Sequence, residues 1–314
     1  MSYFSELIGD SAELQQVVNT ASIISGTDVT VLIEGDTGTG KELLAQALHK
    51  ASIRRHQPLV TVNCASLPES LVESQLFGHR KGAFNGAEAD HCGFAQQAEG
   101  GTLFLDEVAE LPLSIQSKLL RFIEYGEYQR LGDSRSSKSN VRIIAATNQN
   151  LQNQVDKGKF REDLFYRLKV VPLTLPSLVQ RLDDIPLLVK HFFAVLSKQH
   201  EIATPSISKE AISRLRCYNW PGNIRELRNL CESLLILLQG KVIEESNLPP
   251  HIASYTPEQS GFKLPATGIK LDELEVDLLN QALQATAGNK SRAARMLGIT
   301  RDVFLYRLKK YSIV

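Results

Sequence analysis

Apolar residues between Val29 and Val171 fall into short runs that alternate with segments of helical periodicity. The runs are VTVLIEG, LVTVNC, GTLFLDE, VRIIAATN and KVVPLTL, and segments such as Glu42 to Ala51 separate them. Nearly continuous apolar strands are typical of a parallel sheet that is buried on both faces. The pattern therefore predicts an α/β fold in which helices flank a parallel sheet.

The strand pattern stops after Pro176, and helical periodicity replaces it. Residues 183–248 repeat apolar positions at a spacing near 3.6, which predicts a smaller helical domain. Residues 254–268 hold two prolines and two glycines among polar residues and are expected to be a linker. A helix beginning near Leu271 and two short helices around a turn at Gly298 complete the predicted architecture.

Composition and charge exclude some classes of protein. Hydrophobic residues make up 43% of the 314 residues, and 35 basic residues balance 35 acidic ones, so whole-chain charge indicates no partner. The N-terminus has no apolar leader, and no aliphatic run approaches the ~20 residues of a membrane span, so we expect a cytoplasmic protein. Four cysteines without CxxC spacing are predicted to be reduced core thiols: Cys64, Cys92, Cys217 and Cys231.

A glycine-rich stretch, GDTGTGKE, lies between an expected strand and an expected helix. Glycines let backbone N–H groups close around phosphate oxygens, and a lysine can reach the β and γ phosphates, so the stretch predicts an ATP site. Glu42 stands where the general pattern has a hydroxyl ligand for Mg²⁺, which leaves Thr39 and Asp106 as nearby candidates. The expected nucleotide-binding residues here are Gly35, Asp36, Thr37, Gly38, Thr39, Gly40, Lys41 and Glu42.

A second motif, GGTLFLDE, is an apolar strand that ends in two carboxylates. In a P-loop fold, carboxylates at a strand end serve Mg²⁺ and the attacking water. We expect Asp106 to hold Mg²⁺, directly or through water, and Glu107 to polarise the water.

With these motifs in place, the chain resembles the AAA+ domain of bacterial enhancer-binding proteins, which remodel RNA polymerase carrying sigma-54. The likeness runs from about Ile8 to about Leu248. It implies an α/β nucleotide-binding domain at residues 1–174 and a helical lid at 175–250. A linker at 251–270 and a Fis-type helix-turn-helix at 271–314 would follow, with no regulatory domain in front.

The resemblance also gives a meaning to the loop GHRKGAFNGAE. The family's loop reads GAFTGA and touches sigma-54, so Phe84 is expected to be displayed to that partner. Asn85 stands where the family has Thr, which predicts altered coupling to sigma-54 more than altered ATP hydrolysis. The expected contact residues are Gly82, Ala83, Phe84, Asn85, Gly86 and Ala87.

Six further residues take expected roles from the resemblance alone. Asn63 is similar to the residue that holds the catalytic glutamate inactive, and Thr147 and Asn148 are similar to sensor I. Without the family, an Asn at a strand end is equally well a turn cap. Arg161 and Arg167 match arginine fingers that reach a neighbouring subunit's site, and Arg225 matches sensor II of the lid.

The C-terminal segment has a charge pattern of its own. Seven basic residues and one acid lie between Asn289 and Tyr311, a local net charge of +6 that is typical of phosphate-backbone binding. A recognition helix is expected to begin near Arg301. The candidate DNA-binding residues are Lys290, Arg292, Arg295, Thr300, Arg301, Asp302, Tyr306 and Arg307.

The sequence therefore predicts an ATPase that activates sigma-54-dependent transcription from enhancer DNA. The resemblance implies ATP and Mg²⁺ as cofactors, sigma-54 RNA polymerase as partner, and a hexamer with a resting dimer. Control is expected to come from a partner protein acting in trans, from the expression level, or from a domain that precedes this sequence in the native protein. One alternative is a DNA-binding regulator in which ATP drives only assembly and sigma-54 is not remodelled. Another is a general AAA+ unfoldase or clamp-loader-like motor, which the basic C-terminal segment and the GAFNGA loop disfavour.

Overall fold

The computed structural model describes residues 3–255, 268, 270–286, 288–311 and 313. The chain forms two compact units, Met1–Pro257 and Glu258–Val314. Each unit has a hydrophobic core of its own.

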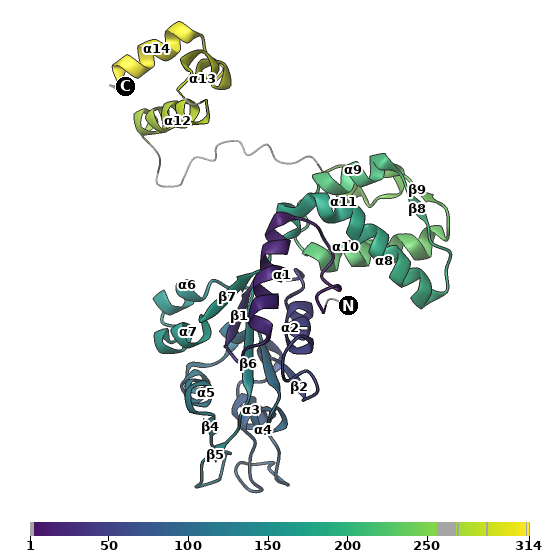
Figure 1. Cartoon of the computed structure of the whole chain (residues 1–314), viewed down its shortest axis with the longest axis vertical. Coiled ribbons are helices and arrows are strands. Elements are labelled where there is room, and N and C mark those ends of the chain that lie inside the picture. The colour runs from purple at the N-terminus through teal and green to yellow at the C-terminus, as the bar shows by residue number, and fades with distance from the viewer. Residues whose placement is uncertain (1–2, 256–267, 269, 287, 312, 314) are drawn as a thin grey trace. The chain divides into compact units, whose positions relative to one another are not determined.

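The first unit is built on a five-stranded parallel sheet (Figure 1). Its strand order is β2-β3-β6-β1-β7, and every pairing in it is parallel, which confirms the predicted α/β class. The strands are β1 (Val31–Glu34), β2 (Leu59–Asn63), β3 (Thr102–Asp106), β6 (Arg142–Thr147) and β7 (Val171–Thr174).

Helices cover both faces of this sheet because alternate residues of each strand point to opposite sides. Val31 and Ile33 pack with α1 (Ala12–Ser25) and α2 (Lys41–Lys50) in one core. Leu32 belongs to the core on the other face. The helices that contribute to that second core are α3 (Val72–Phe77), α4 (Phe94–Gln97), α5 (Leu113–Tyr125), α6 (Leu151–Asp156) and α7 (Glu162–Leu168).

The strand register brings the carboxyl ends of the central strands to one edge of the sheet. Asn63 pairs with Asp106 across β2 and β3, and Glu34 pairs with Thr147 across β1 and β6. The short helices η1 (Cys64–Ser66) and η2 (Val108–Glu110) follow β2 and β3 at the same edge. Polar residues that are far apart in the sequence are therefore gathered there.

One small feature of this unit was not predicted from the sequence. β4 (Glu127–Tyr128) and β5 (Ser137–Lys138) form an antiparallel hairpin, which projects from the sheet domain beyond α5 in Figure 1. Beside it, residues 79–91 form a loop whose ends are joined by a bridge between His79 and His91. The hairpin is too short to leave a clear periodic pattern, whereas the loop contains the GAFNGA stretch that the sequence singled out.

The helical lid follows the sheet and has a core of its own around Trp220, which is 1% exposed. The prediction that strands stop after Pro176 is wrong in one respect, because β8 (Ser206–Ile207) and β9 (Val242–Ile243) form a parallel pair. Two-residue strands carry no alternation that a sequence could reveal. The helices are η3 (Leu178–Asp184), α8 (Ile185–His200), α9 (Lys209–Cys217), α10 (Asn223–Leu238), η4 (Glu245–Asn247) and α11 (Pro250–Ala253).

A buried ion pair holds the N-terminal segment against the lid. The Arg181 guanidinium donates to Asp184 at 2.9 Å, both side chains are 2% exposed, and Arg181 also donates to the carbonyl oxygen of Ile8. Asp184 accepts from the backbone amides of Asp10 and Ser11 at 2.8 and 3.1 Å. The pair is thus hydrogen-bonded to the N-terminal segment through both of its members, which helps to offset the cost of burying it.

The second unit contains three helices, α12 (Leu271–Ala285), α13 (Lys290–Met296) and α14 (Arg301–Lys310). Phe304 is fully buried among Leu279, Ala293 and Leu308, and Gly298 has a φ of 67° in the turn between α13 and α14. Thr300 caps α14 by accepting from the Val303 amide, which confirms the expected helix start. Most of the predicted linker, residues 254–268, lies outside the described residues.

The cysteine prediction is half wrong. All four cysteines are free, but only Cys64 and Cys231 are buried. Cys92, between the His79–His91 bridge and α4, and Cys217, at the end of α9, are exposed. Burial raises the pKa of Cys64 and of Cys231 to about 12, so both stay protonated thiols.

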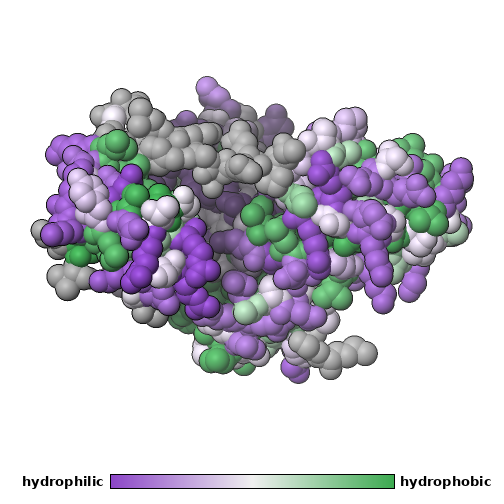
Figure 2. All heavy atoms as spheres, turned by 90° about the horizontal axis from the view of Figure 1, so that it is seen from above, coloured by the Kyte–Doolittle hydropathy of each residue, from purple (hydrophilic) through white to green (hydrophobic). Residues whose placement is uncertain are grey.

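Surface hydrophobicity is dispersed. Figure 2 shows a face that is mostly hydrophilic, with hydrophobic residues in small groups. Within the part of the chain that the structure describes, no helix combines the length and the apolar character needed to cross a bilayer.

Candidate nucleotide-binding site

The glycine-rich stretch forms a loop that connects β1 directly to α2. Gly38 and Gly40 have φ values of 82° and 101°, a region that favours glycine, and Gly40 is the residue before the first turn of α2. The hydroxyl of Thr39, which is 2% exposed, donates to the Asp36 carbonyl oxygen at 2.8 Å. The loop thus has the form expected of a phosphate cradle at a helix N-terminus.

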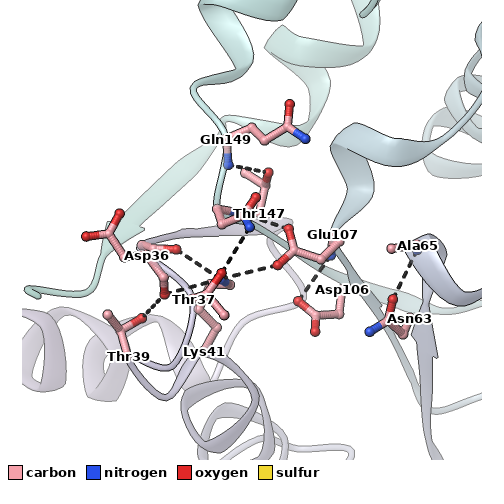
Figure 3. Close-up of polar contacts among 12 residues, drawn as sticks. Asp36, Thr37, Thr39, Lys41, Asn63, Ala65, Asp106, Glu107, Thr147 and Gln149 are labelled. Atoms are coloured by element: carbon pink, nitrogen blue, oxygen red, sulfur yellow. Dashed lines mark hydrogen bonds and ion pairs between the residues drawn. The ribbon is translucent and has the colours of Figure 1, made fainter. Parts of the chain in front are cut away.

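Lys41 is buried and lies across this loop (Figure 3). Its ammonium group donates to the carbonyl oxygen of Gly35 at 2.9 Å and lies 3.6 Å from a carboxylate oxygen of Glu107. The two side chains are 8% and 17% exposed. The Lys41 ammonium, which is expected to contact phosphates, is therefore held by the Gly35 carbonyl and by the carboxylate of Glu107, the candidate catalytic residue.

The carboxylate pair lies at the end of β3. An oxygen of Asp106 accepts from the Glu107 amide at 3.1 Å, and Glu107 itself has a left-handed backbone with a φ of 52°. Burial and the adjacent Glu107 carboxylate raise the pKa of Asp106 above its ordinary value, although Lys41 acts in the opposite direction. A cation bound next to Asp106 would stabilise its ionised form and so offset the effects of burial and of Glu107.

The loop, the carboxylates and the lid together line a cavity of about 570 Å³. Of the predicted site residues, it is lined by Thr37, Gly38, Thr39, Gly40, Lys41, Glu42, Asn63, Asp106, Glu107 and Arg225. Residues that sequence reasoning missed also line it, among them Leu7, Ile8, His191, Phe192 and Arg228. Phe192 falls in the apolar stripe of α8, where the sequence predicts only a lid-core residue, so no pattern distinguished it.

Asp106 is the side chain in this cavity best suited to hold Mg²⁺, because carboxylate oxygens suit hard cations. Thr39 offers only a neutral hydroxyl, Glu107 lies 3.6 Å from the Lys41 ammonium, and Glu42 accepts from Gln46 at 3.2 Å on the exposed side of α2. Asp106 therefore remains the candidate metal ligand that the sequence suggested.

Asn63 and Thr147 make local contacts in this structure. The Asn63 side chain accepts from the Ala65 amide at 3.0 Å and caps η1, while the buried Thr147 hydroxyl accepts from the Gln149 amide at 3.0 Å (Figure 3). Among the described residues, no hydrogen bond joins Asn63 to Glu107. The switch role of Asn63 and the sensor role of Thr147 stay predictions.

Asn148 connects three parts of the site. Its backbone amide donates to a Glu107 carboxylate oxygen at 3.1 Å, and its side-chain amide donates to the Thr37 hydroxyl at 3.1 Å. The end of β6 is therefore joined both to the candidate catalytic carboxylate and to the glycine-rich loop. Its expected role as sensor I stays a prediction.

The two candidate arginine fingers lie on or next to α7 and do not line their own subunit's cavity. Arg161 is exposed and makes a bidentate pair with Asp163, at 3.0 and 2.6 Å, which raises the pKa of the arginine and lowers that of the aspartate. Arg167, in the last turn of α7, is also exposed. Any action on a phosphate would therefore require a second subunit.

The GAFNGA loop is folded back on its own base. Gly82 donates to the Ala87 carbonyl oxygen at 2.8 Å, and the Phe84 ring packs edge-on against His79 with centroids 5.0 Å apart. Phe84 is half-buried here and Asn85 is exposed, and the expected contact of Phe84 with sigma-54 stays a prediction. An apolar ring beside an aromatic surface gains more by packing there than by facing water.

The second unit presents most of its basic residues outward. Lys290, Arg292, Arg295 and Arg301 are exposed, as is the Tyr306 ring at 69%. Arg307, in contrast, pairs with Glu275 of α12 at 2.6 Å. The local charge pattern did not include that acid, because Glu275 lies outside residues 289–311.

A glycine-rich phosphate loop, an acidic strand end and a helical lid around one cavity define an AAA+ nucleotide-binding domain. Residues 7–174 match the Sigma-54 interaction domain, residues 179–263 the AAA+ ATPase lid domain, and residues 270–311 the Bacterial regulatory protein, Fis family. The chain belongs to the family of bacterial sigma-54-dependent transcriptional activators.

Individual relatives agree with this assignment. The transcriptional regulatory protein ZraR of Salmonella typhimurium is 46% identical over 97% of this chain and 68% of its own length. The nitrogen fixation protein AnfA of Azotobacter vinelandii is 44% identical over 98% of this chain and 58% of its length. The crystal structure of NtrX from Brucella abortus in complex with ATP matches with a TM-score of 0.73 and 34% identity, covering 99% of this chain and 70% of that one.

Proposed function

We propose that this protein hydrolyses ATP in a ring of identical subunits and uses the energy to convert sigma-54 RNA polymerase from the closed to the open promoter complex. The observation that carries the proposal is the convergence of Lys41, Asp106 and Glu107 on one cavity with the glycine-rich loop. The sigma-54 interaction domain and the Fis-type domain support the polymerase and enhancer DNA as partners.

In the proposed reaction, the γ-phosphate draws the Lys41 ammonium away from Glu107. Glu107 is then free to accept a proton from a water whose oxygen bonds to the γ-phosphorus, while the bond from that phosphorus to the ADP oxygen breaks and its electron pair stays on ADP. The products are ADP, inorganic phosphate and a proton that Glu107 releases to solvent. Asp106 would hold Mg²⁺, which supplies positive charge to the phosphate oxygens when it is bound. Arg225 of the lid would contact the nucleotide from the opposite side of the cavity.

Arg161 and Arg167 would complete the site of the next subunit. Both are exposed and away from their own cavity, as residues acting in trans must be. Stabilising the charge on a transferring phosphoryl group is worth about 10³–10⁵-fold in rate for arginine fingers. Catalysis would therefore require the ring, which we propose to be a hexamer that assembles from resting dimers.

Movement of residues 79–91 would then transmit hydrolysis to sigma-54. Gly82 and Gly86 have φ values of 81° and 103°, and a Cβ at either would meet nothing within 4 Å, so both act as backbone pivots rather than packing positions. Release of the Phe84 ring from His79 would expose it to the partner. We further propose that a regulatory protein acting in trans controls the ATPase.

The test is ATP-dependent open-complex formation with purified sigma-54 polymerase, comparing the wild type with Asn85→Thr and with Glu107→Ala. Activity that only Glu107→Ala abolishes would support the remodelling motor. A wild type that hydrolyses ATP normally but opens no promoter, and that Asn85→Thr rescues, would favour the alternative of a DNA-binding regulator uncoupled from polymerase. The exposed Asn85 in place of Thr is the observation that keeps this alternative open.

A further inference from the structure

The lid helix α10 begins directly on the phosphate loop. The backbone amides of Ile224 and Arg225, in its first turn, both donate to the carbonyl oxygen of Gly38, at 3.0 and 3.3 Å. The contact is tight, because a Cβ at Gly38 would lie 2.3 Å from the carbonyl oxygen of Gly222. A loop carbonyl from the sheet domain thus caps a helix of the lid.

Asn223, the first residue of α10, makes a second connection with its side chain. It is 3% exposed, and its amide nitrogen donates to the Thr37 carbonyl oxygen at 3.1 Å. Its amide oxygen accepts from the backbone amide of Leu178 at 2.7 Å, at the point where the sheet domain passes into η3. The buried amide therefore uses both ends, one on the phosphate loop and one on the entry to the lid.

The backbone of Asn223 is specialised for this position. Its φ of 52° is left-handed, a conformation that asparagine adopts more readily than most residues with a side chain. Glycine would fit the backbone equally well, but it would supply neither hydrogen bond. The side chain is therefore needed for its two contacts and not for the turn itself.

Thr37 continues the connection towards the chemistry. Its carbonyl oxygen is bound by Asn223, its hydroxyl accepts from the side chain of Asn148, and the Asn148 amide donates to Glu107. Three hydrogen bonds, each of 3.1 Å, thus join the lid to the candidate catalytic carboxylate. Such a contiguous network is a physical route for coupling if one of its elements has two arrangements.

We propose that Asn223 is a positioning residue that transmits the state of the phosphate loop to the lid. Nucleotide phosphates bind the loop amides and displace Lys41 from Gly35, which moves Thr37, and Asn223 carries that movement to the root of α10 and to Leu178. The inference rests on the proposed function in requiring that the cavity bind nucleotide, but it does not require hydrolysis.

Two substitutions separate the two contacts of Asn223. Asn223→Asp keeps an oxygen acceptor for the Leu178 amide but replaces the donor to Thr37 with a second oxygen, so it disconnects only the phosphate loop. Asn223→Gly preserves the left-handed backbone and removes both contacts. The control is Ser208→Ala, which removes the side-chain cap of α9 elsewhere in the lid without touching the loop.

The measurement is the nucleotide-induced change in distance between two spin labels, one on the lid and one on the sheet domain. Native Cys217 takes the lid label, and Ile53→Cys, at a position that is 71% exposed, takes the other in a Cys92→Ser background. ADP and a slowly hydrolysed ATP analogue are the probes. Affinity for both is measured in parallel, together with kcat and KM for ATP.

We expect Asn223→Asp to bind ADP within about threefold of the wild type while losing at least half of the distance change, with kcat falling about tenfold and KM changing little. Ser208→Ala should keep the full distance change. A full distance change in both Asn223 variants would overturn the inference, as would a wild-type lid that does not respond to nucleotide. A wild type that binds nucleotide and moves its lid without hydrolysing it would refute the proposed function and still support the role of Asn223.

Discussion

The Lys41 ammonium and the Glu107 carboxylate lie 3.6 Å apart in a site where both are largely buried. In the proposed ATP hydrolysis, Lys41 would bind phosphate and Glu107 would activate the attacking water. Their mutual attraction is strengthened by the low local dielectric. The two groups therefore neutralise each other, and in the proposed reaction the entry of phosphate would separate them.

Replacing Glu107 with glutamine should separate binding from hydrolysis. Glutamine keeps the shape and can still accept from the Asn148 amide, but it cannot take on the role of a base towards water. We expect the ATPase rate to fall by about 10²–10⁴-fold, with nucleotide affinity within about threefold of the wild type. Steady-state ATPase assays and equilibrium binding of a fluorescent ADP measure the two effects.

The matched control is Glu110→Gln, three residues further on, where the carboxylate accepts from Gln149 outside the cavity. It should retain at least half of the wild-type rate. Equal losses of ATPase rate in the two variants would show that the rate depends on the stability of the carboxyl edge of the sheet and not on the Glu107 carboxylate.

Asp106→Asn should stabilise the nucleotide-free protein while abolishing ATP hydrolysis. The folded protein binds the Asp106 proton more tightly than the unfolded chain does, so stability falls as pH rises from about 3.8 through the higher folded pKa. At pH 7 the cost of the buried charge is fully present, and asparagine removes it. We expect a rise in Tm of about 1–3 °C at pH 7 in the presence of EDTA.

The pH profile distinguishes this explanation from better packing. The difference in Tm between Asp106→Asn and the wild type should shrink as the pH is lowered towards the raised folded pKa of Asp106, because the carboxylate then begins to take up its proton. Asp183→Asn, at an exposed carboxylate, should not raise Tm at pH 7. A constant gain at every pH would argue against buried charge as the cause.

Gly9→Ala should destabilise the first unit strongly. Gly9 has a φ of 146°, and a Cβ there would lie 2.3 Å from both Arg181 and Asp184, the buried ion pair of the lid that contacts the N-terminal segment. Forcing that pair apart leaves a charge poorly compensated, and we expect a loss of about 3 kcal/mol in the free energy of unfolding. Urea denaturation followed by circular dichroism measures it.

Gly26→Ala supplies the comparison, since a Cβ at Gly26 meets nothing within 4 Å and φ is −74°. That change should leave the free energy of unfolding the same or raise it slightly, through the lower entropy of the unfolded chain. If both variants unfolded at the same urea concentration, the tight packing at Gly9 would be of no energetic consequence.

Arg161→Ala should remove ATPase activity without weakening nucleotide binding in its own subunit. Arg161 is exposed, pairs with Asp163, and does not line the cavity of its own chain. We expect at least a ~100-fold loss in rate. Mixing Arg161→Ala with Glu107→Gln subunits should restore part of the activity, because the second variant supplies an intact finger to a site whose Glu107 is intact. Mixtures as inactive as either variant alone would contradict action in trans.

Local chemistry in the sequence predicted the parts of the site that are continuous in the chain. The P-loop is a single stretch with glycines at its turns, and Asp106 and Glu107 end an apolar strand, so spacing alone suggested both. The sequence could not predict that Lys41 pairs with Glu107, since that contact depends on the register of β3 beside the loop. The turn-cap alternative for an Asn at a strand end is what Asn63 shows, since it accepts from the Ala65 amide, whereas no local pattern indicated that Thr147 would accept from the Gln149 amide.

Long-range contacts account for most of what the sequence missed. Leu7 and Ile8 line the cavity only because Arg181 and Asp184 hold the N-terminal segment in place. The pairing of Arg307 with Glu275 depends on how α12 packs against α14. The half-buried Phe84 depends on His79, at the other end of a closed loop. Each requires a packing partner that no local pattern identifies.

The Gly38 carbonyl that receives the first amides of α10 also bears on how the chain is divided. A fragment containing the lid alone would start α10 with those two amides unsatisfied, and a fragment ending before the lid would leave the Gly38 carbonyl without them. A fragment boundary near residue 175 would therefore separate the Gly38 carbonyl oxygen from the two α10 amides that donate to it. Excised pieces of this protein are expected to be less stable than their separate hydrophobic cores suggest.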